Sequence, residues 1–522
     1  MRSYIQSALI MSAAATVIAA AGCSGGHSML PSAGTSASSE ARGQQPGSIV
    51  RATSNPPTQM QMLWLMTDGS VLGQSGSGST WNQFYRYVPD STGNYANGKW
   101  TQVGSLQAGY APDASAADVM IDGRFALIGG EYNVGGGGSN YPLQLTNKAA
   151  VYDPVKMTWT PLGHPNRWKW IGDSPSTVLP NGLVAVGDKL HTWDATLDPK
   201  TLKWTNAGDK GKADFNAEEG WTLLPNGDIL TADVKDAPNS ELYNPTAGKW
   251  TSAGSTIVTL ASKSPFHSCL QYGPKPQDCY MPPGEIGPSI LRPDGTVFYA
   301  GSGQNGSGSG TGHTAIYNSN TGTWTAGPDF PNSDNAGDNF GVLEPSGNVI
   351  IFGNSGNAYE WNGSTFTELS GLQEDGSPIL LPTGQIMMAG YNLVIYTPKG
   401  TPKASWAPTI TNAPSNITAG QTYKITGTQF NGLSQAMAFG DEYQNATNYP
   451  LVRITNNGSG TVYYARTHDH STMGVATGSQ SVSTNFDVPS NAPAGASTLV
   501  VVANGIASKP VSVTVSGTRR RR

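Results

Sequence analysis

The sequence has little charge, few cysteines and no apolar run long enough to cross a bilayer. Only 12% of its 522 residues are Asp, Glu, Lys or Arg, which is about half the share in an average soluble domain. This excludes coiled coils and long helical bundles, which need Glu, Lys and Arg in abundance. The net charge of −5 without a basic stripe argues against nucleic-acid binding, because such proteins cluster Lys and Arg to neutralise phosphates.

Glycine and aromatic residues are abundant instead. The chain holds 65 Gly, 36 Pro, 13 Trp and 21 Tyr. Gly and Pro together stay below the share that marks low-complexity disorder, and the many rings favour a packed interior. The composition therefore predicts a folded all-β protein rich in turns, and the length predicts two or three domains.

Residues 1–23 are typical of a secretion signal. Arg2 supplies a positive charge, and the apolar stretch 8–21 is too short to span a bilayer as a helix. The stretch closes on Ala20-Ala21-Gly22-Cys23, which resembles a bacterial lipobox except that Ala20 stands where Leu is usual. We therefore expect an exported protein whose Cys23 carries a lipid in the bacterial cell envelope, on the periplasmic side or at the cell surface. Cleavage without a lipid is the alternative.

The segment 24–58 is rich in Ser, Gly, Pro and Gln and has almost no large apolar side chain. Such a segment cannot bury enough surface to fold. We therefore expect a flexible linker between the lipid and the first domain.

Two cysteines remain after Cys23, namely Cys269 and Cys279. An even number of cysteines in an exported protein predicts a disulfide between them. Two free thiols in a surface loop are the alternative.

From about residue 59 to residue 400 the sequence repeats a unit of two hairpins. Short apolar runs enter a Pro-x-Gly or Asp-Gly turn and leave as a β-branched or aromatic run, and each turn needs a Gly at positive φ. The seven turn glycines are Gly69, Gly123, Gly182, Gly227, Gly295, Gly347 and Gly384. Units of ~40–50 residues with such turns are typical of four-stranded kelch blades. The sequence therefore predicts a seven-bladed β-propeller over 59–400.

The second hairpin of several units keeps a fixed spacing between two aromatic residues. Seven residues separate Tyr152 from Trp159, Tyr243 from Trp250, Tyr317 from Trp324 and Tyr359 from Phe366. We expect each pair to pack between neighbouring sheets. A two-sheet sandwich, the rival fold, would not repeat this interval.

After Pro398 the repeat stops. Residues 401–516 contain other strand-like runs, at 423–425, 499–502 and 511–515, separated by Pro, Gly and Asn turns. About 110 residues of this kind fit an immunoglobulin-like β-sandwich. Residues 517–522 end in four Arg, and we expect a solvated basic tail there. Contact of this tail with an anionic polymer is the minor alternative.

A seven-bladed propeller followed by a sandwich resembles galactose oxidase and its relatives, the copper-radical oxidases. The motifs that carry the resemblance lie around the join of the two domains, and it covers most of the chain from about residue 60. They are Leu381-Pro-Thr-Gly, Ile395-Tyr-Thr-Pro, Pro408-Thr-Ile, Gly420-Gln-Thr-Tyr-Lys-Ile, Ala436-Met-Ala-Phe-Gly and Leu451-Val-Arg-Ile-Thr.

The resemblance implies a copper site, but the family's ligands do not match this sequence. The family has a Tyr-His pair where Glu374 and Asp375 stand here, and a sandwich His where Gln444 stands. Its radical Tyr is cross-linked to a Cys, whereas we expect Cys269 and Cys279 to pair with each other. Copper prefers imidazole and thiolate over carboxylate and amide ligands. We therefore expect no copper-radical site, no metal and no cofactor.

Acidic residues recur just ahead of the expected innermost strands. These strands run in parallel around the channel, so the residues ten and nine before each turn Gly share one rim. Acids fill seven of these fourteen positions, although 35 acids in 522 residues would place about one there by chance. Converging carboxylates repel each other, raise some pKa values and attract cations or hydroxyl-rich ligands. The seven are Asp113, Asp173, Glu218, Glu285, Asp338, Glu374 and Asp375.

Large side chains near these acids indicate a ligand class. Arg167, Trp168 and Trp170 lie ahead of Asp173, and rings can cover the apolar face of a sugar while carboxylates accept its hydroxyl hydrogens. We therefore predict an acidic channel mouth that binds a glycan or another polar ligand, in a monomer that touches the membrane through its lipid alone. A carbohydrate hydrolase or lyase using two rim carboxylates is one alternative. A structural or adhesive surface module, in which the acids only fasten neighbouring blades, is another.

Overall fold

The computed structural model describes residues 45–134, 142–208, 210–264, 266–305, 308–440 and 443–517. The chain divides into two compact units, 1–43 and 44–522, and the described residues belong to the second unit. The predicted signal, Cys23, the linker up to residue 44 and the tail from residue 518 lie outside the described residues. Within the described part of the chain, no helix is long and apolar enough to cross a membrane.

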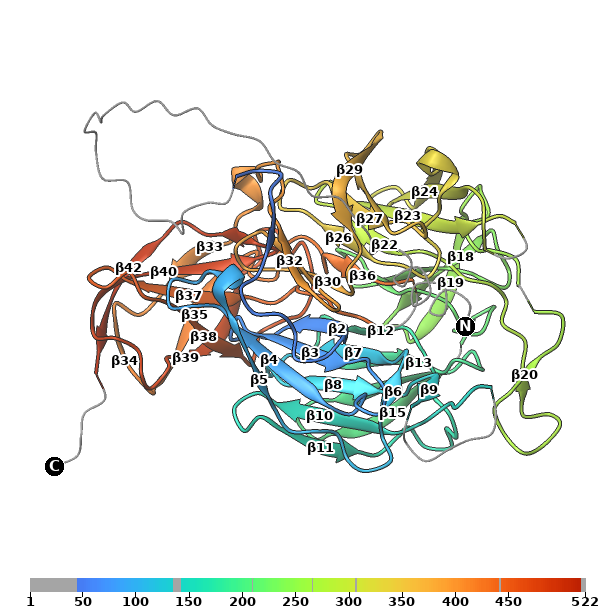
Figure 1. Cartoon of the computed structure of the whole chain (residues 1–522), viewed down its shortest axis with the longest axis horizontal. Coiled ribbons are helices and arrows are strands. Elements are labelled where there is room, and N and C mark those ends of the chain that lie inside the picture. The colour runs from blue at the N-terminus through green and yellow to red at the C-terminus, as the bar shows by residue number, and fades with distance from the viewer. Residues whose placement is uncertain are drawn as a thin grey trace, which may run out of the picture. The chain divides into compact units, whose positions relative to one another are not determined.

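Seven antiparallel sheets form the blades of a β-propeller (Figure 1), which confirms the seven-bladed prediction. Each blade is given from its innermost strand outward. Blades 1 to 3 are β2 (Met60–Leu65), β3 (Val71–Ser75), β4 (Phe84–Val88), β5 (Lys99–Gln102); β7 (Ala116–Val119), β8 (Phe125–Ile128), β10 (Ala149–Asp153), β11 (Thr158–Leu162); and β12 (Ser176–Val178), β13 (Val184–Gly187), β14 (Asp194–Asp198), β15 (Lys203–Gly208).

The other four blades follow the same plan, except that blade 7 takes its outer strand from the N-terminus. They are β16 (Thr222–Leu223), β17 (Ile229–Ala232), β18 (Asn239–Asn244), β19 (Lys249–Ser255); β22 (Ser289–Leu291), β23 (Thr296–Gly303), β24 (Gly312–Asn318), β25 (Thr323–Ala326); β26 (Gly341–Leu343), β27 (Val349–Phe352), β28 (Asn357–Trp361), β29 (Phe366–Gln373); and β30 (Pro378–Leu380), β31 (Ile386–Ala389), β32 (Leu393–Tyr396), β1 (Ile49–Arg51).

Strand β1 closes the propeller ring. It pairs antiparallel with β32, with Val50 opposite Ile395. The predicted linker 24–58 is therefore wrong for 49–51, which belongs to blade 7. Composition missed this strand because its three residues bury little: only Val50 is half-buried, and the strand is held by its backbone pairing.

The turn glycines and the aromatic pairs explain why these residues form blades. All seven turn glycines have φ between +73° and +88°, a range that L side chains rarely adopt. Tyr152 lies opposite Trp159, with ring centroids 5.3 Å apart. Blade 6 differs from the prediction, because its turn starts directly after Trp361. Phe366 therefore pairs with Trp361, at 5.3 Å, and not with Tyr359.

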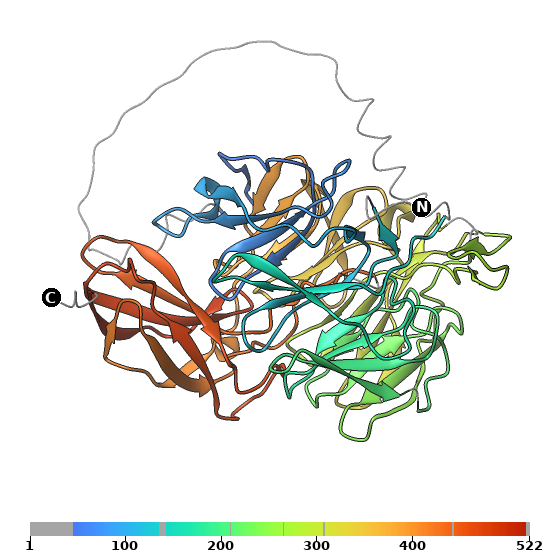
Figure 2. The same ribbon diagram turned by 90° about the horizontal axis from the view of Figure 1, so that it is seen from below.

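The C-terminal strands form one nine-stranded sheet at one side of the propeller in both views (Figures 1 and 2). This sheet has a hydrophobic core of its own, which includes Ile425, Val452 and Phe486. The immunoglobulin-like sandwich stays a prediction. The strands, in spatial order, are β33 (Thr409–Asn412), β35 (Thr422–Thr428), β39 (Val482–Asp487), β38 (Val462–His468), β37 (Leu451–Asn456), β40 (Gly495–Ala503), β42 (Val511–Ser516) and β34 (Asn416–Thr418), with β41 (Ile506–Ala507) on β40.

A few short elements lie outside these sheets. A two-stranded sheet of β6 and β9, which flank β7 and β8, a hairpin of β20 and β21, and three single-turn 3₁₀ helices lie between the larger strands. They are β6 (Pro112–Asp113), β9 (Tyr132–Asn133), β20 (Leu270–Gln271), β21 (Cys279–Tyr280), η1 (Tyr95–Asn97), η2 (Pro331–Ser333) and η3 (Ala404–Trp406).

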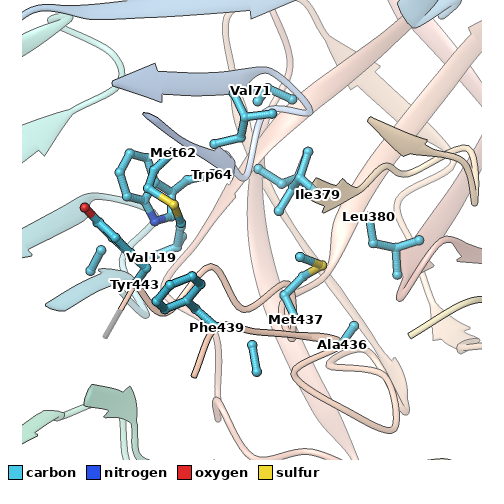
Figure 3. Close-up of a cluster of buried hydrophobic side chains, with 14 of the residues drawn as sticks. Met62, Trp64, Val71, Val119, Ile379, Leu380, Ala436, Met437, Phe439 and Tyr443 are labelled. Atoms are coloured by element: carbon cyan, nitrogen blue, oxygen red, sulfur yellow. The ribbon is translucent and has the colours of Figure 1, made fainter. Parts of the chain in front are cut away.

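A segment of the C-terminal domain fills the propeller channel. We call residues 434–440 and 443–449 the channel segment. Its strand β36 (Met437–Ala438) extends the sheet of blade 6 by pairing with β26. Figure 3 shows Phe439 and Tyr443 near Met62 and Trp64 of blade 1, and Met437 on the side of Ile379 of blade 7, within one hydrophobic cluster. The motif that resembled a sandwich strand therefore belongs to the propeller interior.

The channel segment contacts every blade. Beside its β36 pairing with blade 6, Gly440 lies against the backbone leading into blade 5, where an added Cβ would meet the Ile286 carbonyl oxygen at 2.5 Å. Side-chain and backbone hydrogen bonds reach the remaining blades. Tyr449 donates to Leu65 O, Tyr443 N to Ser115 O and Asn445 to Pro378 O, whereas Gln435 donates to Thr177 and accepts from Leu223 N.

Candidate functional site

The seven predicted acids lie where the chain enters the innermost strands. Asp113, for example, ends β6 just before β7, and Asp173 precedes β12. All innermost strands start at the same end of the channel, because consecutive blades repeat one up-and-down order. We call this end the mouth.

The carboxyl groups at the mouth are close enough to shift one another's protonation. The pKa of Asp113 is affected by Glu131 and Asp338, that of Glu285 by Glu218 and Asp338, and that of Glu374 by Asp338 and Asp375. The structure thus brings all seven predicted acids together and adds Glu131. We call these eight residues the mouth acids, and their role as ligand contacts stays a prediction.

Lys189 supplies a positive charge to one half of the mouth. It lies in the loop between β13 and β14 and its side chain has no exposed surface. Its Nζ is 2.5 Å from Asp173 Oδ1, 2.7 Å from Glu218 Oε1 and 3.3 Å from Glu131 Oε1. These three carboxylates raise the pKa of Lys189 well above its usual value although burial opposes its charge. The ammonium therefore stays charged and joins residues of blades 2, 3 and 4.

Three carboxylates around one ammonium leave an excess of negative charge. Burial, followed by the neighbouring Glu131, raises the pKa of Asp173 well above its usual value. Tyr280 donates a hydrogen bond from its hydroxyl to Glu218 Oε1 at 3.2 Å. This half of the mouth is therefore an ion-pair network in which Asp173 and Glu218 are buried and Glu131 is half-buried.

The other half of the mouth is more open. Glu285, Asp338 and Glu374 are half-buried. Burial, followed by Glu218 and Asp338, raises the pKa of Glu285 well above its usual value. Burial also raises the pKa of Glu374 to about 7, against a hydrogen bond from Asn339. Near neutral pH, Glu374 can therefore both accept a hydrogen bond and, when protonated, donate one.

Asp113 and Asp375 are tied to the scaffold beside this open half. The Tyr443 hydroxyl donates to Asp113 Oδ1 at 2.5 Å, so the channel segment forms the floor of the mouth. Burial raises the pKa of Asp113 to about 7, although Tyr443 stabilises its charged form. Asp375 accepts hydrogen bonds from the Tyr391 backbone N at 3.2 Å and from Asn392 Nδ2 at 3.0 Å.

The three large side chains predicted beside Asp173 differ in their exposure and contacts. Trp168 is 1% exposed within the hydrophobic core, so its prediction as a ligand contact is wrong. Trp170 is half-buried and packs edge-on against Tyr272, 5.8 Å away. Arg167 is exposed with φ of +71°, and its role stays a prediction.

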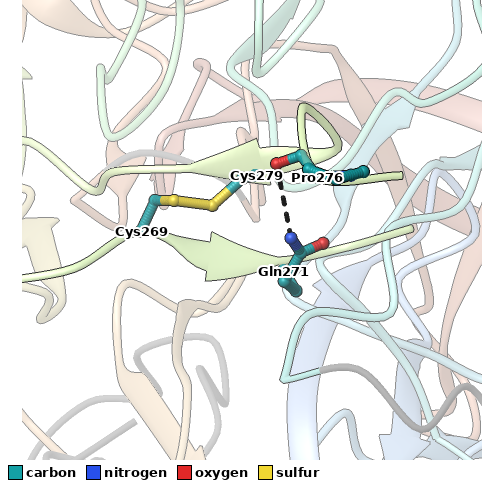
Figure 4. The surroundings of a disulfide bond; sticks show 4 residues. All are labelled: Cys269, Gln271, Pro276 and Cys279. Atoms are coloured by element: carbon teal, nitrogen blue, oxygen red, sulfur yellow. Dashed lines mark hydrogen bonds between the residues drawn. A yellow bond between two sulfur atoms is a disulfide. The ribbon is translucent and has the colours of Figure 1, made fainter. Parts of the chain in front are cut away.

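The predicted disulfide is confirmed. Cys269 and Cys279 are bonded across the hairpin of β20 and β21 (Figure 4). The free-thiol alternative is therefore excluded. The hairpin carries Tyr280, the residue after Cys279, into the mouth beside Glu218.

Sequence reasoning missed Glu131 and Lys189. Glu131 directly follows Gly129-Gly130, and that diglycine was a usable signal for a residue at the end of a blade strand. Lys189 carried no signal, because a single Lys in a surface-type loop is usually solvated. Its burial depends on contacts with two neighbouring blades.

A second buried lysine, Lys212, lies inside blade 4. Like Lys189 it is surrounded by carboxylates, so the two clusters can be compared. Lys212 Nζ is 2.9 Å from Glu219 Oε2 and 2.6 Å from Glu241 Oε2, with none of these side chains more than 4% exposed. Asp233 lies close by, and burial raises its pKa to about 7. This cluster has no open half, so we regard it as structural.

No protein-family model and no curated protein matches this sequence. Many solved structures are similar in part, and the following three are among them. A fungal alcohol oxidase of the AA5 family in complex with copper is 15% identical, with 90% of this chain and 99% of that chain covered and a TM-score of 0.49. An inactive virginiamycin B lyase from Staphylococcus aureus with Quinupristin is 11% identical, with 67% and 98% covered and a TM-score of 0.44. The extracellular domain of a one-component system from B. thetaiotaomicron is 9% identical, with 89% and 57% covered and a TM-score of 0.43.

Proposed function

We propose that this chain is a propeller protein that binds a glycan or another polar ligand at its acidic mouth. The observation that carries the proposal is the gathering of carboxyl groups from six blades at one channel end, with Glu285, Asp338 and Glu374 only half-buried. A purely structural set of acids would be enclosed on all sides, as around Lys212. Half-buried carboxyl groups, one of which, Glu374, has its pKa raised to about 7, suit a ligand with several hydroxyl groups.

An exposed aromatic ring in the loop that carries Lys189 supports a sugar ligand. Trp193 is 37% exposed and stacks on His191, with ring centroids 3.9 Å apart. Both residues lie in the loop that carries Lys189 into the mouth. An exposed flat ring can cover the apolar face of a sugar whose hydroxyl groups are bound by carboxylates.

We propose that the mouth does not hold the copper of a radical oxidase. The groups brought together there are carboxylates, the Lys189 ammonium and the hydroxyls of Tyr280 and Tyr443. Copper prefers imidazole and thiolate, and Cys269 and Cys279 are consumed in a disulfide. This donor set does not fit copper. Copper uptake with peroxide production from an alcohol substrate would overturn the proposal.

A glycan-binding panel tests the main proposal. We expect the wild-type chain to bind one class of glycan, and Glu285→Gln and Glu374→Gln to weaken that binding about tenfold each, because each replaces a carboxyl oxygen that can accept a ligand hydrogen bond with an amide nitrogen that only donates. Glu368→Gln is the matched control, since Glu368 is an exposed acid on the outer strand β29. Equal binding by all four proteins, or no binding to any glycan or polyol, would contradict the proposal.

A carbohydrate hydrolase or lyase is the second candidate. Glu374, with its pKa raised to about 7, is next to Asp375, which is held by Asn392, and two carboxyl groups with different environments are what acid and base roles need. A turnover assay on the bound glycan, with wild type and Asp375→Asn, decides between binding and catalysis. Turnover that Asp375→Asn abolishes would establish the enzyme.

We also propose export with a lipid on Cys23, and an immunoglobulin-like sandwich for the C-terminal strands. The lipobox-like residues before Cys23 and the separate C-terminal core support these two proposals. Cys23→Ser should move the protein from the detergent phase to the aqueous phase in a partition experiment. An unchanged partition would show that no lipid is attached there.

A further inference from the structure

The disulfide hairpin reaches across the propeller from its place in the sequence. It is inserted between β19 of blade 4 and β22 of blade 5, yet it packs on the loops of blades 2 and 3. The Leu143 backbone N donates to the Gln271 carbonyl oxygen at 3.2 Å, and the Tyr272 ring packs edge-on against Trp170. The hairpin therefore spans the side of the mouth that holds Lys189.

Tyr280 closes this side of the mouth. Its hydroxyl bonds to Glu218 Oε1, and the Lys189 Nζ is 5.0 Å from its ring centroid. Phe215 packs edge-on against the other side, 6.0 Å away. Tyr280 is 6% exposed and the Lys189 side chain is fully enclosed. The hairpin thus supplies a side chain that separates the ion-pair network from solvent.

The hairpin packs on its neighbours through Leu270, Tyr272 and Tyr280, but the strand pairing within it is short. Its two strands, β20 and β21, contain two residues each, and isolated two-stranded hairpins are marginal in water. The disulfide joins two residues ten positions apart in the sequence. It lowers the conformational entropy of the opened hairpin and so favours the closed one. The closed position of Tyr280 should therefore depend on the cross-link.

We propose that the Cys269–Cys279 disulfide keeps the hairpin closed as a lid over Lys189 and its three carboxylates, and that a dithiol reductant opens this half of the mouth. Two electrons and two protons from the dithiol convert the disulfide into two thiols, and the dithiol becomes a disulfide itself. The rest of the propeller stays folded, because its blades are closed by strand pairing that does not involve the hairpin. This inference goes beyond ligand binding and does not depend on it.

Amide hydrogen exchange of the full chain provides the first test. In the oxidised protein the Leu143 amide is protected by Gln271. We expect its exchange to become about tenfold faster with the dithiol, because local opening exposes that hydrogen bond. Strand β17 in blade 4 is the internal control and should exchange at one rate in both states. Unchanged exchange at Leu143 would overturn the proposal.

Hydroxyl-radical footprinting of a Cys269→Ser/Cys279→Ser variant provides a second test. We expect oxidative labelling of Tyr280 to rise about tenfold over wild type, because the ring leaves its enclosed position. Tyr243 is the matched control: it is 5% exposed in blade 4 and packs on Trp250. No rise at Tyr280 contradicts the lid. An equal rise at Tyr243 also contradicts it, because the disulfide would then support the whole fold.

Discussion

Lys189 shows how a single buried side chain can hold neighbouring blades together. Its ammonium contacts carboxylates from blade 2, from its own blade and from blade 4 within 3.3 Å. An ion pair of this kind contributes little net stability when both partners are present, but removal of one partner leaves an uncompensated buried charge. At the residue scale the mouth is therefore built around this one cation.

Replacing Lys189 by Met should destabilise the protein strongly. We expect the free energy of unfolding to fall by about 3–5 kcal/mol, because three buried carboxylates lose their counter-charge. The loss should be smaller at pH 5 than at pH 8, since protonation neutralises the remaining carboxylates. Urea unfolding at both pH values measures the effect. Lys156→Met is the control, because that side chain is 75% exposed; equal effects of both changes would refute the role of Lys189.

Glu374 should make stability depend on pH in a defined direction. Its pKa is raised from 4.5 to about 7 in the folded state, so the folded state binds more protons than the unfolded state between these values. Stability from this group is complete below pH ~4.5 and is lost as the pH rises through 7. Between pH 5 and pH 8, the free energy of unfolding should therefore fall by about 1 kcal/mol less in Glu374→Gln than in wild type. This figure is reduced from the full effect of the pKa shift because Glu374 is partly exposed.

Chemical denaturation of both proteins at pH 5 and pH 8 gives this difference. The exposed acid Glu368 is the control, and Glu368→Gln should follow the wild-type pH dependence. A Glu374→Gln variant that loses as much stability as wild type would show that the carboxyl group titrates normally.

At the scale of elements, strand β1 closes the ring with only three residues. It bonds to β32 along its whole length, with Val50 opposite Ile395, so blade 7 combines the two ends of the propeller sequence. Sequence composition pointed to a linker here. A strand whose stability comes from backbone pairing has no strong side-chain pattern, which is why the prediction failed.

Val50→Pro should loosen this closure. Proline cannot donate a backbone hydrogen bond and is poorly tolerated inside a paired strand, so we expect a loss of about 3 kcal/mol. Thermal unfolding followed by circular dichroism measures it. Asn55→Pro serves as the control, because Asn55 is exposed and lies after the strand. If both variants melt like wild type, β1 does not stabilise the ring.

At the scale of the whole molecule, the channel segment links the C-terminal strands to all seven blades of the propeller. Gln435 alone bridges two blades, since its Nε2 donates to Thr177 Oγ1 at 2.9 Å and its Oε1 accepts from Leu223 N at 2.8 Å. The segment also forms the floor of the mouth through Tyr443. The site therefore depends on residues from both ends of the fold.

Gln435→Ala should weaken this coupling. We expect a loss of about 1–3 kcal/mol, because the buried Leu223 amide is left without its acceptor. Equilibrium unfolding followed by tryptophan fluorescence gives the value. The exposed Gln421→Ala is the matched control, and an equal loss in that variant would remove the case for a bridging role.

The sequence by itself determined the seven-bladed propeller, the position of the acids ahead of the innermost strands, and the disulfide of Cys269 with Cys279. These features depend on local rules: turns that need Gly at positive φ, a repeated interval between rings, and an even number of cysteines. Each can be recognised within a short stretch of chain.

Only the tertiary structure decided how the mouth is divided. Lys189 partly compensates the charge of one half, while Glu285, Asp338 and Glu374 are half-buried in the other. It also decided that Trp168 belongs to the core and that the channel is filled from the C-terminal domain. The physical reason is that burial and charge compensation are set by groups far apart in the sequence, and a local pattern carries no information about which of them meet.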